Sequence, residues 1–298
     1  MIVEAGQGSE VHRLITWAVS ILEDNDVIKP RLNAEQLLQH YTGRSRTELY
    51  AYPERSVPEP EKGAFAAGVR RRAAREPLQF ITGLRGFRYL ELAVDRRALI
   101  PRPETEILVE RAVELLRAAR GHPVVADVGT GSGCIAVSIA RECPAAIVHA
   151  TDVSGDALAV ARMNASRLGL DGVVDLHLGD LLDALHLELM GKLNLIVSNP
   201  PYIRENDFPS LPPEVREHEP YISLVAGPAG TEVHFRLMQQ ARGWLAPGGL
   251  LLMEGGEDQV EDLAEEATGL GYGGVGVHAD LNGRPRIVEM RLKPTPIS

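Results

Sequence analysis

Segments typical of strands alternate with segments typical of helices from residue 123 onward, and this alternation limits the possible folds more than any other feature. The stretch "PVVADVG" predicts a strand, "GCIAVSIAREC" the helix after it, and "AAIVHATDV" the next strand. The pattern continues to a closing strand, "IVEMRLK". Because such alternation places helices on both faces of a mainly parallel sheet, we expect an α/β fold.

The first 78 residues show a different pattern, which predicts a small helical bundle. One apolar stripe at helical spacing consists of Val11, Leu14, Ile15, Ala18, Val19 and Leu22. Residues 79–98 alternate apolar and aromatic side chains around glycines and predict a β-hairpin linker. We therefore expect a bundle over residues 1–78, the linker, and an α/β domain over residues 99–298. The bundle is typical of a stability or docking module without chemistry of its own.

Composition and charge exclude several classes of protein. The chain has 44% hydrophobic and 24% charged residues, which is typical of a globular protein with a sizeable core. A formal net charge of −10 argues against a broad basic face for duplex nucleic acid. No apolar run reaches the roughly 18 residues needed to cross a bilayer, so no membrane partner is expected. The basic run at residues 70–75 is either the solvated end of a helix or a surface for RNA or a partner protein.

Cysteine and histidine usage predicts the compartment and bears on metals. The two cysteines, Cys134 and Cys143, form no ligand or disulfide pattern, which is typical of the reduced cytoplasm. The nine histidines show no zinc-type spacing such as His-Glu-x-x-His. We therefore expect a cytoplasmic protein without a metal site.

A glycine-rich turn joins the first predicted strand of the α/β domain to its helix. Its residues are Gly129, Thr130, Gly131, Ser132 and Gly133. In this setting glycines let a ligand approach the backbone closely. A dinucleotide fingerprint would need its third glycine at Cys134, and no Lys-Ser/Thr pair follows to form a P-loop. The turn therefore predicts a nucleoside-type cofactor, with a merely structural tight turn as the alternative.

Two acidic residues follow the next two predicted strands. Asp152 ends the second strand, and its carboxylate offers acceptors for both hydroxyls of a ribose. Asp180 follows the third strand at the carboxyl edge, where open α/β sheets bind ligands. Asp180 is placed either to accept from an adenine amino group, with Leu181 packing on the ring, or to cap a helix.

The stretch Asn199-Pro200-Pro201-Tyr202 follows the fourth strand at the same edge. An amide or nucleobase nitrogen is a poor nucleophile because its lone pair is delocalised into the neighbouring π system. Two acceptors on its N–H groups, the Asn199 side-chain oxygen and the Pro200 carbonyl, would free that lone pair to attack a methyl group. The prolines stiffen the turn, and Tyr202 offers a flat face for stacking. We therefore expect Asn199, Pro200 and Tyr202 to be catalytic, with neither a metal nor a strong base.

The chain resembles the HemK/PrmC family of protein-(glutamine-N5) methyltransferases over nearly its whole length. "RLNAEQLLQHYTGRSRTELY" is similar to the family's N-terminal bundle, and "DVGTGSGCIAVSIA" and "IVSNPPYI" match its catalytic domain. "LIPRPETE" is the most discriminating stretch, because the wider Asn-Pro-Pro-Tyr methyltransferases, including those acting on adenine N6, lack it. The resemblance implies a Rossmann-like class I methyltransferase fold with a mainly parallel, seven-stranded sheet.

The same resemblance implies a cofactor, a partner and site residues. Family members use S-adenosylmethionine, release S-adenosylhomocysteine, and methylate the glutamine of the Gly-Gly-Gln loop in class-I peptide chain release factors. By resemblance, residues 129–133, Asp152, Leu181 and Asn199 would bind the cofactor. Asn199, Pro200, Pro201 and Tyr202 would hold the glutamine side chain, and residues 99–102 would wall the pocket.

Three stretches depart from the family pattern, and two other functions stay open. The departures are "VAGPAGTE" at residues 225–232, "MEGGEDQ", and Asn194 before the motif; they belong to loops or the sheet and not to the transfer centre. The first rival function is methylation of a nucleic-acid amine by the same Asn-Pro-Pro-Tyr chemistry, against which the net acidity counts. The second is a cofactor-binding module without transfer activity, or an NAD-type oxidoreductase, and Cys134 disfavours NAD.

Overall fold

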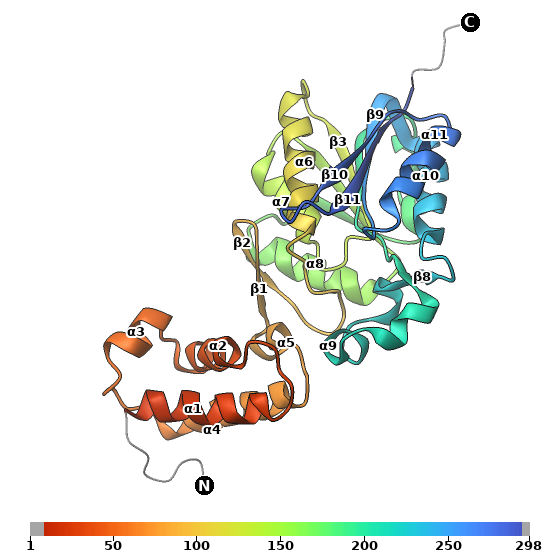
Figure 1. The fold of residues 1–298 in the computed structure, drawn as a ribbon. Helices are drawn as coiled ribbons and strands as arrows, with labels where there is room; N and C mark the ends of the chain where they lie inside the picture. Colours follow the sequence, from red (N-terminus) through yellow and green to blue (C-terminus); the bar gives the residue numbers. More distant parts are fainter. Residues whose placement is uncertain (1–8, 294–298) are drawn as a thin grey trace, which may run out of the picture. The chain divides into compact units, whose positions relative to one another are not determined.

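The computed structural model of the chain describes residues 9–293, which form two compact units. Within the described residues, the smaller unit comprises residues 9–83 together with Pro212–His218, and the larger comprises Leu84–Leu211 together with residues 219–293 (Figure 1). Within residues 9–293, no helix is both long enough and apolar enough to cross a bilayer.

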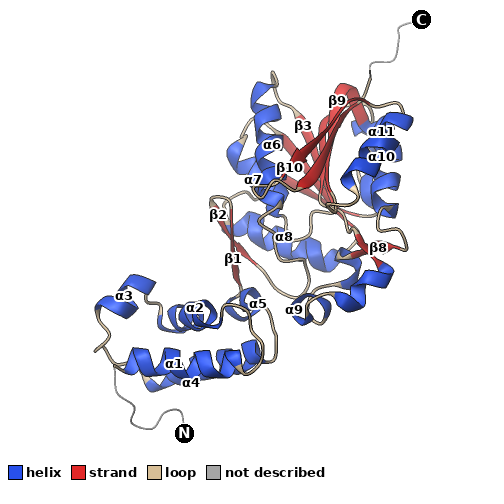
Figure 2. Cartoon of the chain, in the orientation of Figure 1, coloured by secondary structure: helices blue, strands red, loops and turns tan. Residues whose placement is uncertain are grey.

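The smaller unit is a bundle of short helices, as the apolar spacing predicted. Its helices are α1 Glu10–Glu23, α2 Pro30–Thr42, α3 Arg46–Ala51, α4 Glu59–Ala73, α5 Leu78–Thr82 and α9 Pro213–Arg216 (Figure 2). Ser9 and Ser45 cap α1 and α3, because their hydroxyls accept backbone N–H groups that have no partner within the helix. The predicted stripe on α1 packs against α2 and α4 and is buried except at Val19, which is half-buried.

Three arginines of the basic run at the end of α4 are bound by carboxylates within this unit. Glu214 of α9 accepts from Arg72 at 2.9 Å and from Arg75 at 2.7 Å, and Arg71 pairs with Glu76 at 2.8 Å. Although burial raises the pKa of Glu214, the hydrogen bonds from Arg75 and Arg72 outweigh it and lower the pKa to about 2. Arg72 is buried. It therefore fits neither of the two interpretations of the run, which were a solvated helix end and an open cationic surface.

The larger unit contains a seven-stranded, mainly parallel sheet, which confirms the predicted fold class. Its strands are β3 Val124–Val128, β4 Ile147–Asp152, β5 Val174–Leu178, β6 Leu193–Ser198, β9 Leu245–Glu254, β10 Gly273–Ala279 and β11 Pro285–Arg291. They lie in the order β10-β11-β9-β6-β3-β4-β5. β11 runs antiparallel to both of its neighbours, and the other pairs are parallel.

Helices cover both faces of this sheet, as the strand–helix alternation required. α6 Thr105–Ala118, α7 Cys134–Glu142 and α8 Gly155–Arg167 cover one face, and α10 Glu232–Trp244 and α11 Val260–Gly269 cover the other (Figures 1 and 2). Each face therefore has its own apolar core. Short elements complete the unit: η1 Leu181–Ala184, η2 Leu187–Leu189, β7 Ile203–Arg204, η3 Glu205–Ser210, η4 Tyr221–Ser223 and β8 Val225–Gly227.

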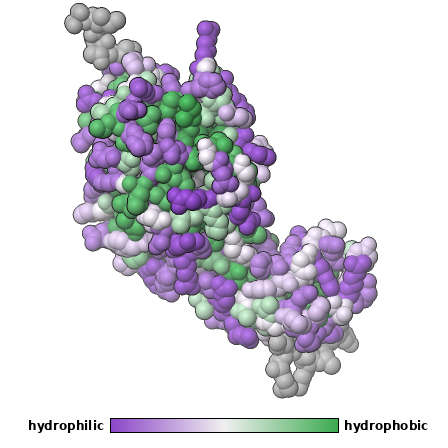
Figure 3. Space-filling model, turned by 180° about the vertical axis from the view of Figure 1, so that it is seen from behind, coloured by the Kyte–Doolittle hydropathy of each residue, from purple (hydrophilic) through white to green (hydrophobic). Residues whose placement is uncertain are grey.

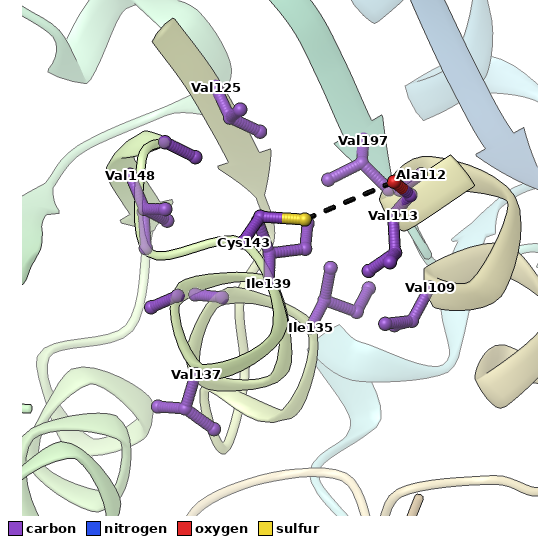
Figure 4. Close-up of a cluster of buried hydrophobic side chains, with 14 of the residues drawn as sticks. Val109, Ala112, Val113, Val125, Ile135, Val137, Ile139, Cys143, Val148 and Val197 are labelled. Carbon is purple, nitrogen blue, oxygen red and sulfur yellow. Dashed lines mark hydrogen bonds between the residues drawn. The ribbon is translucent and has the colours of Figure 1, made fainter. Parts of the chain in front are cut away.

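The core beneath α6 and α7 is rich in small and branched side chains. Figure 4 shows side chains of these two helices gathered over the strands: Val109, Ala112, Val113, Ile135 and Ile139, with Val125, Val148 and Val197 from the sheet. Cys143 belongs to the same cluster, and its thiol lies 3.9 Å from the carbonyl oxygen of Val113. Cys143 and Cys134 are both buried free thiols, so they serve packing.

A β-hairpin begins the larger unit and is held by one buried asparagine. β1 Leu84–Phe87 pairs antiparallel with β2 Leu90–Ala93, so residues 79–98 contain this hairpin and the end of α5. The Asn164 side chain of α8 accepts from the Ala93 N–H at 2.7 Å and donates to the carbonyls of Ala93 and Ser132, at 3.0 and 2.8 Å. Because Asn164 is 1% exposed, water cannot replace these bonds.

Replacing Asn164 by alanine should destabilise the larger unit. Three buried backbone groups would lose their partners, and we expect the free energy of unfolding to fall by about 3 kcal/mol. Urea unfolding of the full chain measures this loss. The control is Asn206→Ala, because Asn206 is exposed and should tolerate the change. Equal losses in the two variants would contradict the role given to Asn164.

Candidate functional site

Four neighbouring parallel strands end at one edge of the sheet, and the predicted site residues follow them. β3, β4, β5 and β6 lie side by side in the order β6-β3-β4-β5. The glycine-rich turn follows β3, Asp152 is the last residue of β4, Asp180 follows β5, and Asn199 follows β6. Ligands bind at this edge in open α/β sheets.

The glycine-rich turn crosses the end of β4 on its way from β3 into α7. The backbone N–H groups of Gly129 and Thr130 both donate to the carbonyl of Thr151, each at 2.9 Å. Gly133 has a φ of +82°, and a Cβ there would lie 3.1 Å from the Ala161 backbone of α8. Glycine is therefore required at this position by both the backbone conformation and the close packing.

Asp127, at the end of β3, holds this turn from inside the protein. It is fully buried, and its Oδ2 accepts from the Thr130 hydroxyl at 2.6 Å and from the Ala136 N–H at 3.0 Å. Burial raises the pKa of Asp127 to about 7, against the lowering effect of these hydrogen bonds. Asp127 and Thr130 thus shape the turn.

Asp152 fixes the ligand-facing side of the turn. One of its oxygens accepts from the Gly131 N–H and the other from the Ser154 N–H, both at 2.8 Å. Burial raises the pKa of Asp152, although these backbone hydrogen bonds oppose the shift. Because a carboxylate offers about four acceptor positions, two remain for the hydroxyls of a ligand.

A cavity of about 420 Å³ opens beside these residues, within the range of about 300–1,000 Å³ that is usual for small-molecule sites. Of the predicted cofactor residues, Gly129, Gly131, Asp152, Asp180, Leu181 and Asn199 line it, whereas Thr130, Ser132 and Gly133 do not. Pro200 and Pro201 also line it, together with apolar residues such as Val128, Ala157 and Ile222. Seen from behind, the larger unit shows apolar surface bordered by polar side chains (Figure 3).

Asp180 does not cap the helix that follows it, so that interpretation is wrong. Its side chain makes no capping hydrogen bond and pairs instead with Arg236 of α10, and both residues line the cavity. Leu181 has a φ of +49°, which is uncommon for a residue with a branched side chain. Contact of Asp180 and Leu181 with an adenine ring stays a prediction.

A chain of hydrogen bonds orients Asn199. Its Nδ2 donates to the Thr105 hydroxyl at 2.9 Å, and that hydroxyl donates to Glu254 Oε2 at 2.7 Å. Because an ionised carboxylate only accepts, the Thr105 oxygen must accept from the Asn199 NH₂ group. The Asn199 Oδ1 makes no hydrogen bond within the described part of the chain and is left for a ligand.

Glu254, the last residue of β9, begins this chain and is 1% exposed. Burial raises its pKa to about 7, and the hydrogen bond from Thr105 opposes the shift. Sequence reasoning missed both Glu254 and Thr105, because they lie far from Asn199 along the chain. Thr105 does fall within "LIPRPETE", the most discriminating stretch, and Glu254 falls within the atypical "MEGGEDQ", so these two stretches were the available signals.

Tyr202 lines a second, smaller cavity instead of the first. This cavity has a volume of about 270 Å³, and Arg204, Gln259 and Arg286 also line it. The Tyr202 carbonyl accepts from Gln259 Nε2 at 3.0 Å, and burial raises the pKa of the Tyr202 hydroxyl to about 12. The atypical "MEGGEDQ" stretch, which ends at Gln259, therefore builds a wall next to the predicted motif. Stacking of Tyr202 on a substrate stays a prediction.

Glu219 anchors the segment 99–102, of which Leu99 lines the larger cavity. Its carboxylate accepts from the Ile100 N–H at 3.2 Å and from the Arg102 guanidinium at 2.7 Å. No local sequence signal indicated Glu219 or Arg236, because each acts on a segment distant in the chain.

The sheet order, the glycine turn with its acid at the end of β4, and the Asn-Pro-Pro-Tyr stretch after β6 define a Rossmann-like class I methyltransferase that depends on S-adenosylmethionine. Two family models match the chain: the PrmC N-terminal domain at residues 13–83 and the methyltransferase small domain at residues 104–210.

Similar proteins identify the family more closely. A release factor glutamine methyltransferase of Rhodopirellula baltica is 38% identical, covering 94% of this chain and 96% of its own. A release factor glutamine methyltransferase of Moorella thermoacetica is 42% identical, and the match covers 90% of this chain and 94% of that protein. A crystal structure of a release factor-specific protein-(glutamine-N5) methyltransferase from Alicyclobacillus acidocaldarius is 30% identical, covers 68% of this chain and 100% of its own, and has a TM-score of 0.41. The chain belongs to the release factor glutamine methyltransferase family, which confirms the resemblance found in the sequence.

Proposed function

We propose that this protein transfers a methyl group from S-adenosylmethionine to the side-chain amide N5 of the glutamine in the Gly-Gly-Gln loop of class-I peptide chain release factors. The observation that carries this proposal is the orientation of Asn199, whose carboxamide oxygen is available at the wall of the cavity. The names of the relatives support the substrate. Because release factors act on ribosomes, the reaction would take place in the cytoplasm.

The larger cavity suits S-adenosylmethionine. Asp152 retains acceptor positions for the two ribose hydroxyls, Leu181 offers an apolar contact for the adenine, and Asp180 an acceptor for its amino group. Bound there, the cofactor supplies an electrophilic methyl group on a sulfonium, whose sulfur becomes neutral when the methyl leaves.

Asn199 and Pro200 would activate the substrate amide. Asn199 Oδ1 and the Pro200 carbonyl, neither of which has a hydrogen-bond donor among the described residues, would accept the two N–H groups of the glutamine. The nitrogen lone pair would then attack the methyl carbon in line, so that a C–N bond forms as the C–S bond breaks. One amide proton passes to solvent. The two prolines hold the acceptors at fixed positions, because proline restricts φ.

The smaller unit would bind the release factor away from the target loop. It matches the PrmC N-terminal domain over residues 13–83, and none of its residues lines the cavity described above. Nucleic acid is a poorer candidate partner, because the net charge is −10 and the guanidinium groups of Arg71, Arg72 and Arg75 are already bound by carboxylates.

Mass spectrometry of a class-I release factor tests the proposal. After incubation with enzyme and S-adenosylmethionine, the peptide with the Gly-Gly-Gln glutamine should gain the mass of one methyl group. Asn199→Ala should abolish this gain in mass, whereas its affinity for S-adenosylmethionine should fall by a smaller factor. A release factor with glutamate in place of that glutamine is the matched control. The docking role further predicts a lower KM for the whole release factor than for the isolated loop peptide. Transfer of a labelled methyl group from the cofactor to DNA or RNA, and not to the release factor, would overturn the proposal.

Replacing Thr105 by valine should slow methyl transfer. Valine keeps the shape of threonine but removes the hydroxyl, so the Asn199 amide loses the partner that orients it. We expect kcat to fall about tenfold, which corresponds to roughly 1.4 kcal/mol, with an unchanged Kd for S-adenosylmethionine. Thr105→Ser keeps the hydroxyl and should retain most activity. Single-turnover kinetics distinguish these outcomes, and a Thr105→Val enzyme as fast as the parent would refute the orienting chain.

The rate should also depend on the ionisation of Glu254. Below its raised pKa of about 7, Glu254 is protonated and can donate to Thr105. When the Asn199 carboxamide then turns over, its Oδ1 accepts from the Thr105 hydroxyl and is no longer available to the substrate. We expect the rate of the chemical step to fall as pH decreases through about 7, and Glu254→Gln to remove this dependence. Asp127→Asn is the control, because the pKa of Asp127 is also about 7. If Asp127→Asn alone flattened the profile, Glu254 would not be the group responsible.

A further inference from the structure

Two histidines and an aspartate meet on one face of the sheet at its β5 edge. His149 lies on β4, and Asp175 and His177 lie two positions apart on β5. His149 is the register partner of Asp175. Since residues i and i+2 of a strand point to the same face, all three side chains lie on one surface. None of them lines the cavity of the candidate site.

Single atoms of the three side chains converge into a nearly equilateral triangle. His149 Nδ1 and His177 Nε2 are 3.2 Å apart, and Asp175 Oδ2 lies 3.4 Å from the first and 3.1 Å from the second. Hydrogen bonds do not satisfy this arrangement fully. If both imidazoles donate to the shared carboxylate oxygen, their two N–H groups face each other, and if one donates to the other, one contact to the carboxylate lacks a proton.

A metal ion satisfies all three contacts at once. Zinc binds histidine nitrogen at about 2.0–2.1 Å and carboxylate oxygen at about 2.0–2.2 Å, so two ligand atoms of a tetrahedral site are about 3.3 Å apart. The three separations in this cluster, 3.1, 3.2 and 3.4 Å, match that spacing. Two imidazoles and one carboxylate also form a donor set that suits zinc and its neighbours among the divalent transition metals.

We propose that His149, Asp175 and His177 form a binding site for one divalent transition-metal ion, zinc in the first instance, separate from the methyl-transfer site. The sequence predicted no metal site, because an Asp-x-His pair on one strand and a histidine on the next match no zinc motif. Water takes the fourth position. Thr151 is the register partner of His177 and lies on the same face. Its fully buried hydroxyl has no hydrogen-bond partner among the described residues, and a metal-bound water can be that partner.

The burial of the cluster and its access from solvent favour binding. His149 and His177 are each 9% exposed, whereas the Asp175 side chain is 61% exposed and leaves an approach for the ion. The ion would link the edge strand β5 directly to β4. His186 packs edge-on against the His177 ring, with the ring centroids 5.5 Å apart.

Calorimetric titration of the untagged, chelator-treated full chain with ZnCl₂ tests the site. We expect one ion per chain, a raised Tm on binding, and intense visible absorption when Co²⁺ replaces Zn²⁺, which indicates tetrahedral coordination. Loss of a metal's outer-shell partner alone costs about 10–100-fold in affinity, so Asp175→Asn and His177→Ala should each weaken binding by at least about tenfold.

Matched controls separate this site from surface binding. Asp171→Asn makes the same change at an exposed residue shortly before β5, and His122→Ala removes an exposed histidine of the larger unit; both should bind Zn²⁺ like the parent. The Asp175→Asn variant should fold like the parent, because this side chain is largely exposed and the change preserves its shape. Weaker Zn²⁺ binding by this variant would therefore report loss of a ligand and not misfolding. The proposal is overturned if the parent takes up no stoichiometric Zn²⁺, or if Asp175→Asn and a folded His177→Ala bind as tightly as the parent.

Discussion

The functional site depends on the constraint that parallel strands end at the same edge of their sheet. Helical crossovers return the chain to the start of each next strand, so the ends of β3, β4, β5 and β6 meet although long segments separate them. Each end contributes one kind of group: backbone N–H donors, two acids and one carboxamide. The core beneath α6 and α7 keeps these ends in register, because its small branched side chains allow the helices to pack closely on the sheet.

Within this frame, one buried carboxyl group decides which way an amide faces. The two ends of the Asn199 carboxamide have nearly the same shape, so packing alone cannot distinguish oxygen from nitrogen. Glu254 distinguishes them through Thr105, because an acceptor at one end of a hydrogen-bond chain sets the direction of every bond in it. Burial that raises a carboxyl pKa is usually unfavourable for stability, and here it accompanies a defined orientation of the reactive amide.

The sequence allowed the prediction of whatever depends on neighbouring residues. The strands, the glycine turn, Asp152 and Asn199 all follow from short patterns with a local physical cause. Contacts between distant segments could not be predicted in this way, and they include Thr105 with Glu254, Glu219 with Ile100, and the triangle formed by His149, Asp175 and His177. β10 was not indicated either, because its stretch "GGVGVHA" contains three glycines, which weaken the pattern of a strand.

The placement of α9 affects how the helical bundle can be studied alone. Residues 212–218 belong to the bundle although they lie between two parts of the larger unit in the sequence, and Glu214 binds Arg72 and Arg75. A fragment cut at Gly83 therefore lacks that carboxylate and leaves the Arg72 guanidinium without its counter-ion. An affinity for the release factor measured with such a fragment would include the cost of this uncompensated charge. It would therefore understate the contribution of the intact bundle to binding.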